Sequence, residues 1–167
     1  CDTVLGFVDK GATAADHVTG GRKVVEAGIT LSEYVMPGLG GRKWRREHAV
    51  ETARVLNEIA PHFVRLRSLT LKEDMPLYES VQRGDFEAPS EEEVVEESGW
   101  LIENLDCHAE LKSDHVMNLL PEIEGRLPEE KDRLLGVVSK FLALPAAERL
   151  GFCLGRRAGY YEKLLGT

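Results

Sequence analysis

The stretch that decides the fold is Leu31–Gly41, which reads LSEYVMPGLGG. Its first half contains Tyr34, Val35 and Met36, large residues that are typical of a β-strand. Its second half, Pro37–Gly41, contains three glycines, which permit a tight turn and a close approach of the backbone to a ligand. A helical pattern follows at once. Because α/β folds build their sites at the carboxyl ends of strands, we expect an α/β domain with a site at this turn.

The residues after the turn predict a second strand parallel to the first. Arg42–Arg46 is basic and contains one tryptophan, which predicts a solvated loop. Alanine and leucine then recur at helical spacing, which predicts a helix from about Glu47 to Ala60. Phe63–Leu71 alternates in the manner of a strand. A strand, a helix and a strand form a βαβ unit, whose strands should be parallel and whose crossover should be right-handed.

We expect the chain to divide into an α/β segment, residues 1–76, and a mainly helical extension, residues 77–167. Capping boxes at Thr13 and Ser90 predict the starts of two helices. The extension should contain only one short strand. Its predicted elements are a helical turn at Leu77–Val81, a helix to Leu105, a strand at His108–Lys112, a short helix capped by Ser113 or Asp114, a loop at Pro121–Leu127, a helix with Pro128 in its first turn, and a last helical region from Pro145 to Leu165 interrupted by glycines.

The composition indicates a globular protein and argues against nucleic-acid-binding and membrane-spanning classes. The 167 residues, 43% hydrophobic and 30% charged, are enough for one globular domain with a core. A net charge of -8 argues against a general nucleic-acid face, and no apolar run approaches the length of a membrane span. Three distant cysteines do not form a disulfide framework, so we expect a reduced, cytoplasmic compartment. The first residue is Cys1 rather than Met, and we expect the chain to be an excised part of a longer protein.

Two arginines are the strongest candidates for a binding site. Arg65 and Arg67 are two residues apart on the predicted second strand, so both should point to the same face. Guanidinium groups on a partly buried face need anionic partners or a wet cavity. The pair therefore indicates either a pocket for a carboxylate or phosphate, or an edge-strand face in solvent, and the residues alone favour neither.

The histidines and acidic clusters carry weaker signals. Cys107, His108 and His115 have the right side chains for zinc but no recognised spacing, so we predict no metal site. Ser113-Asp114-His115 is better explained by helix capping than by a catalytic triad, because adjacent residues do not converge on one point. The acidic run Glu91–Glu97 predicts a solvated helix start. We find no residue to name as catalytic.

Several segments together resemble the radical S-adenosylmethionine enzymes. Val8–Thr13 (VDKGAT) resembles the turn after the fourth strand of that family, and Ala27–Gly41 resembles its fifth strand with the glycine-ended motif. The segment His48–Ala53 resembles the helix that follows. Phe63–Leu69, with Met75–Leu77 and a later glycine, resembles the sixth strand and the segment after it. The branch that this order and spacing resemble most is that of oxygen-independent coproporphyrinogen III oxidase-like proteins and uncharacterised iron–sulfur oxidoreductases.

The resemblance implies a fold and two cofactors. The family has a partial (β/α)6 barrel, of which this chain would be the C-terminal half, with two to three parallel strands followed by the helical extension. The intact protein would use S-adenosylmethionine and a 4Fe–4S cluster held by a Cys-x-x-x-Cys-x-x-Cys loop. That loop is absent here, since the closest two cysteines are Cys107 and Cys153, so we expect this chain alone to retain neither cofactor and to be inactive.

The resemblance also assigns cofactor-binding positions. Lys10 matches a basic position that contacts the carboxylate of the bound methionine group. Tyr34 and Met36 match fifth-strand positions that line the cofactor, with Met36 near the adenine. Gly38 matches the glycine that lets the adenine lie close to the backbone.

Arg65 and Arg67 match sixth-strand positions that face the barrel interior in this family, so the resemblance also places both among the expected cofactor-binding residues. Gly40-Gly41 stand where the oxidase branch often has a proline, and the substrate is left open.

Two functional hypotheses follow. The first is a part of a radical S-adenosylmethionine oxidoreductase that supplies one wall of the cofactor and substrate pocket. The alternative is a non-catalytic interaction or regulatory domain on a degenerate half-barrel. A half-barrel has two open sheet edges, so we also expect that the helical extension covers one edge and that a second copy of the chain covers the other, as a homodimer.

Overall fold

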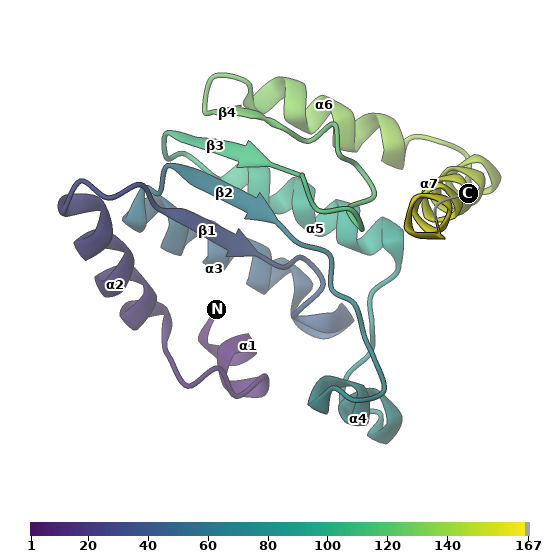
Figure 1. The fold of residues 1–167 in the computed structure, drawn as a ribbon, viewed down its shortest axis with the longest axis horizontal. Helices are drawn as coiled ribbons and strands as arrows, with labels where there is room; N and C mark the ends of the chain where they lie inside the picture. The colour runs from purple at the N-terminus through teal and green to yellow at the C-terminus, as the bar shows by residue number, and fades with distance from the viewer. Residues whose placement is uncertain (166–167) are drawn as a thin grey trace.

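The computed structural model describes residues 1–165, which form a sheet and the helices that pack against it (Figure 1). The sheet has four strands in the order β1-β2-β3-β4 among these residues. β1, β2 and β3 are parallel, and β4 pairs antiparallel with β3. The predicted α/β class and the predicted parallel strands are confirmed. The strands are β1 (Ser32–Val35), β2 (Phe63–Leu66), β3 (Ala109–Lys112) and β4 (Gly125–Leu127).

The described residues form seven helices, two of which begin at the predicted capping boxes. The side chains of Thr13 and Ser90 each accept a hydrogen bond from the backbone N–H three residues later, and the acidic residue there bonds back. The helices are α1 (Asp2–Phe7), α2 (Ala14–Glu26), α3 (Gly41–Ile59), α4 (Pro76–Arg83), α5 (Glu91–Asn104), α6 (Lys131–Leu142) and α7 (Ala146–Leu165).

The two faces of the sheet differ. Helices α3 and α5 cover one face, and Figure 1 shows the strands lying in front of them. On β2, Val64 and Leu66 point into this covered side and are fully buried, whereas Phe63 and Arg65 lie on the opposite face and are only half-buried. The main core therefore lies between the sheet and one layer of helices. The opposite face of the sheet carries the alternate, more polar residues.

The prediction of a basic loop at Arg42–Arg46 is wrong, because these residues form the first turns of α3. Basic side chains at a helix N-terminus interact unfavourably with the helix dipole. Here acidic side chains just before α5 and within α5 pair with the arginines at the start of α3 and offset that repulsion. Arg42 pairs with Glu87 at 2.5 Å and with Glu93 at 2.8 Å, and Arg45 pairs with Glu96 at 2.6 Å. These partners lie more than 40 residues away in sequence, so no local pattern reveals them.

Other boundaries also differ from the predictions. β2 ends at Leu66 rather than Leu71, and β4 lies in the segment predicted as a loop. No helix follows Asp114, and Pro128 lies before α6 rather than in its first turn. The glycines of α7 do not interrupt that helix.

The sheet crosses the predicted boundary after residue 76, because β3 beyond the boundary pairs with β2 before it. The core likewise combines residues from both sides, such as Leu56 and Leu111. Among residues 1–165, no helix has the length and apolar character that a membrane crossing requires.

Candidate functional site

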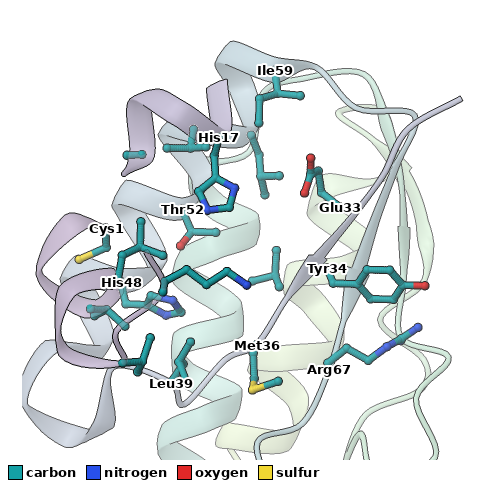
Figure 2. Close-up of a pocket in the computed structure, with 18 residues that line it drawn as sticks. Cys1, His17, Glu33, Tyr34, Met36, Leu39, His48, Thr52, Ile59 and Arg67 are labelled. Carbon is teal, nitrogen blue, oxygen red and sulfur yellow. The ribbon is translucent and has the colours of Figure 1, made fainter. Parts of the chain in front are cut away.

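A cavity of about 410 Å³ lies beside the edge strand β1 (Figure 2). Its walls come from α1, the start of α2, β1, the glycine turn and α3. Figure 1 shows α1 and α2 on the side of β1 away from β2, which leaves this space between them and the sheet. Most of its lining is apolar, including Val4, Leu39 and Leu56. A cavity of this size, with an apolar lining and a few polar groups, is typical of small-molecule sites.

Four of the six predicted cofactor-binding residues line this cavity: Lys10, Tyr34, Met36 and Arg67. They come from three separate segments. Lys10 follows α1, and its backbone N–H donates to the carbonyl of Leu5 at 2.9 Å. Tyr34 and Met36 belong to β1 and the turn after it, and Arg67 follows β2 directly. The fold thus brings these positions together around one space.

The other two predicted residues, Gly38 and Arg65, do not line the cavity. Gly38 has φ +94°, a conformation that side chains other than glycine adopt only with strain, and a Cβ there would lie 3.3 Å from Cγ of Pro89. Its N–H donates to Oε2 of Glu97 at 2.9 Å. Arg65 lies on the open face of the sheet, where its Nε donates to the hydroxyl of Ser32 at 3.2 Å.

The ionisable groups of the cavity are mainly basic. Lys10, Arg67, His17 and His48 line it, against a single carboxylate, Glu33. Burial raises the pKa of the Glu33 carboxyl, and nearby His17 partly opposes that shift. A cavity with this balance suits a ligand that carries a carboxylate or another anionic group.

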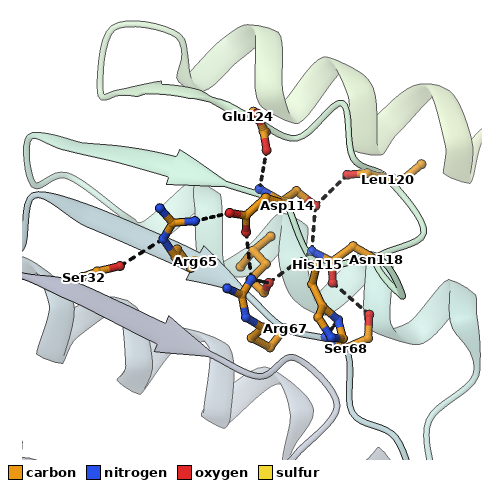
Figure 3. A network of polar contacts seen from close by, with 11 residues as sticks. Ser32, Arg65, Arg67, Ser68, Asp114, His115, Asn118, Leu120 and Glu124 are labelled. Carbon is orange, nitrogen blue, oxygen red and sulfur yellow. Dashed lines mark hydrogen bonds and ion pairs between the residues drawn. The ribbon is translucent and has the colours of Figure 1, made fainter.

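Arg65 and Arg67 share one anionic partner on the open face of the sheet (Figure 3). Asp114 accepts a hydrogen bond from each guanidinium, from Arg67 at 2.8 Å. The bond from Arg67 and the nearby positive charges lower the pKa of Asp114. Burial opposes the charged form of Arg67, yet its hydrogen bond to Asp114 and the proximity of Tyr34 raise its pKa overall. The guanidinium of Arg67 also lies 4.5 Å from the ring centre of Tyr34.

This cluster corrects the interpretation of Ser113-Asp114-His115 as a helix cap. Asp114 binds the two arginines, and the hydroxyl of Ser113 donates to the carbonyl of Leu120 at 2.9 Å. Nδ1 of His115 accepts from the N–H of Ser68 at 3.4 Å, and burial together with Arg67 lowers the pKa of this imidazole. The three side chains diverge, so they form neither a cap nor a triad.

A second cluster was missed by the sequence analysis. Glu97 of α5 is 1% exposed, so its assignment to a solvated helix start is wrong. Its Oε1 lies 2.7 Å from Nδ1 of His48, and its Oε2 accepts from the N–H of Gly38. The sequence did contain one indication that Glu97 is buried. It lies four residues before Leu101, so both residues are on the apolar face of α5.

No group of three potential metal ligands occurs within the described part of the chain. The cysteines lie apart: Cys1 lines the cavity, Cys107 belongs to the core, and Cys153 lies on α7. All three are free. Burial raises the pKa of the Cys107 and Cys153 thiols, which disfavours the thiolate that metals bind.

Comparison with known proteins gives no identification. No family model, no curated protein and no solved structure matches this chain.

Proposed function

We propose that this chain is part of a radical S-adenosylmethionine enzyme and that the cavity beside β1 is part of its cofactor pocket. One observation supports this most. Lys10, Tyr34, Met36 and Arg67 were assigned to the cofactor from separate sequence segments, and all four line the same cavity. The three adjacent parallel strands are also compatible with the C-terminal half of a barrel.

The chemistry of the lining fits the proposed cofactor. Lys10 and Arg67 offer cationic groups for the carboxylate of the methionine moiety. Met36, Leu39 and Val55 offer apolar surface of the kind on which an adenine ring packs. When bound and reduced, S-adenosylmethionine supplies a radical that abstracts hydrogen from a substrate. The role of this chain would be to bind and orient the cofactor.

The 4Fe–4S cluster does not fit the residues of this chain. Three thiolates would have to meet at one iron–sulfur unit, whereas the three cysteines lie on the cavity wall, in the core and on α7. The proposal therefore places the cluster ligands in another part of the protein and assigns no step to them here.

The proposal can be tested by titrating S-adenosylhomocysteine, a stable analogue, into the purified chain and measuring heat or NMR shifts. We expect saturable binding that perturbs the methyl resonance of Met36 but not that of Met117. Lys10→Ala should weaken it by about tenfold, because a charge-assisted hydrogen bond contributes about 1.5 kcal/mol. The matched control is Lys140→Ala, on α6 and outside the cavity. Absence of binding at millimolar analogue would overturn the proposal.

A second prediction concerns iron. Anaerobic reconstitution of this chain with iron and sulfide should yield no stoichiometric cluster, because the cysteines are dispersed. Iron and sulfide analysis, with the visible absorption spectrum, measures this. A full equivalent of 4Fe–4S cluster on the purified chain would show that the ligands had been wrongly assigned.

A non-catalytic interaction domain is the second candidate, because the open face of the sheet carries an exposed aromatic residue. Tyr34 is 63% exposed there, and β1 and β4 are the sheet edges among the described strands. The homodimer stays a prediction. The titration above separates the two candidates, since an interaction domain requires no affinity for the analogue.

A further inference from the structure

Glu97 is a buried carboxylate with two partners: His48, which lines the cavity, and Gly38, which lies between the lining residues Met36 and Leu39. One oxygen, Oε2, accepts from the N–H of Gly38 at 2.9 Å, and the other, Oε1, lies 2.7 Å from Nδ1 of His48. Glu97 itself lies on α5 and does not line the cavity. A carboxylate that is 1% exposed requires such partners, since burying an unpaired charge is strongly unfavourable.

The 2.7 Å contact between Oε1 of Glu97 and Nδ1 of His48 constrains which ring nitrogen carries a proton. An ionised carboxylate only accepts hydrogen bonds, so the proton between Glu97 and His48 lies on Nδ1. In a neutral imidazole that leaves Nε2 as an acceptor with a free lone pair. The same arrangement orients histidines in many enzyme sites, where a buried carboxylate fixes the tautomer.

His48 presents its ring to the cavity. It is 8% exposed and lines the cavity, and Figure 2 shows its imidazole on the same side of the view as Leu39. Within residues 1–159, whose side chains the structure describes, Nε2 has no hydrogen-bond partner, and the ring bonds to Glu97 through Nδ1. Gly40 leaves room for this side chain, because a Cβ added there would lie 3.1 Å from Cβ of His48.

We propose that Nε2 of His48 accepts a hydrogen bond from a hydroxyl or amino group of the molecule bound in the cavity, and that Glu97 positions it. The inference rests on the proposed function for the ligand's class, since S-adenosylmethionine carries ribose hydroxyls and amino groups. His48 is then a ligand-contacting residue. Glu97 is a positioning residue that acts through it.

Glu97 also connects two walls of the cavity. Met36 and Leu39 flank Gly38 in the turn after β1, and both line the cavity. The bond to the Gly38 N–H holds this turn, while the bond to His48 holds α3. One carboxylate outside the cavity therefore fixes the relative position of the turn and the imidazole.

Glu97→Gln tests the positioning role with little change in volume. The Gly38 N–H can only donate, so the amide oxygen of Gln should take that bond and its NH₂ group should face His48. Nδ1 must then accept, and the proton moves to Nε2. We expect ¹⁵N NMR of the imidazole to show the Nδ1–H tautomer in the wild type and the Nε2–H tautomer in the variant. An unchanged tautomer in the variant would show that Glu97 does not determine which nitrogen of His48 is protonated.

Binding of S-adenosylhomocysteine tests the ligand contact. We expect the analogue to shift the Nε2 resonance of His48 in the wild type. In Glu97→Gln its affinity should fall by about tenfold, because an acceptor facing the ligand has become a donor. Glu96→Gln is the matched control, since Glu96 lies on the same helix, pairs with Arg45 and does not line the cavity. Its affinity should equal that of the wild type.

The outcomes separate the inference from the proposed function. If the wild type binds the analogue with no shift at Nε2, or if Glu97→Gln binds it equally well, the inference is wrong and the proposed function stands. A doubly protonated His48 at neutral pH would also overturn it, because Nε2 would then be a donor. If the wild type does not bind the analogue at all, both the proposed function and the inference are wrong.

Discussion

Two charged clusters lie on opposite sides of the sheet and differ in their exposure. Glu97, His48 and the Gly38 N–H form the first, on the helix-covered side, where Glu97 and His48 are 1% and 8% exposed. Asp114, Arg65 and Arg67 form the second, on the open face, where the Asp114 side chain is 37% exposed. In each cluster, hydrogen bonds join segments that are distant in sequence.

The difference in exposure determines what each cluster contributes. Water can replace a lost partner on the open face, so exposed ion pairs contribute about 1 kcal/mol or less. A buried donor that loses its acceptor has no such substitute, and the full desolvation penalty appears. We therefore expect the buried cluster to dominate stability, although it contains fewer charges.

Glu97→Leu should give the largest effect. Leucine leaves Nδ1 of His48 and the Gly38 N–H without an acceptor, and we expect the free energy of unfolding to fall by about 3 kcal/mol. Urea denaturation measures this. Glu96→Leu, at the half-buried neighbour on α5 whose side chain is 41% exposed, should lose less than about 1 kcal/mol. Equal losses of unfolding free energy in Glu97→Leu and Glu96→Leu would contradict the larger contribution assigned to the buried cluster.

Gly38→Ala should give the second largest loss of stability. At φ +94° an L-residue is strained, and the new Cβ would lie 3.3 Å from Cγ of Pro89. We expect a loss of about 2 kcal/mol in urea denaturation. Gly28→Ala, also at positive φ but with open space around it, measures the strain without the contact and should lose less. A larger loss at Gly28 would show that packing at the turn is unimportant.

Asp114→Asn should have a smaller and pH-dependent effect. The pKa of Asp114 is lowered in the folded state, so its stabilisation is present above the unfolded pKa, about 3.9, and is lost as pH falls through the folded value. The variant should lose less than about 1 kcal/mol at pH 7 and nothing in strong acid. Salt at 1 M should reduce the difference at pH 7. If the variant lost the same stability in strong acid as at pH 7, the stabilisation would not come from the ionised carboxylate of Asp114.

Tyr34→Leu should have the smallest effect. It removes the stacking of Arg67 on an exposed ring while keeping an apolar side chain, and we expect a loss of about 0.5 kcal/mol. Thermal denaturation can detect such a change. Val116→Ala, an exposed residue after Asp114, serves as the surface control. A loss above about 2 kcal/mol would place Tyr34 in the core rather than on the open face.

The sequence by itself determined the local elements. The capping boxes at Thr13 and Ser90 predicted two helix starts correctly, because their bonds join residues only three apart. The alternation at Phe63–Leu71 predicted a strand with both arginines on one face; the strand ends at Leu66, and Asp114 binds both arginines. The glycine turn after β1 was also predicted, since glycine adopts a positive φ at the least cost, as it does at Gly38 and Gly41.

Only the tertiary structure decided which of these residues meet. Arg42 starts a helix instead of a loop because Glu93, some fifty residues later, lies beside it. Asp114 forms no helix cap because two arginines of another strand take its carboxylate. Glu97 appeared to belong to a solvated acidic run, yet the packing of α5 against α3 buries it against His48. Local patterns record the bonds within a few residues, whereas the pairing of charges across the chain depends on how the helices and strands pack.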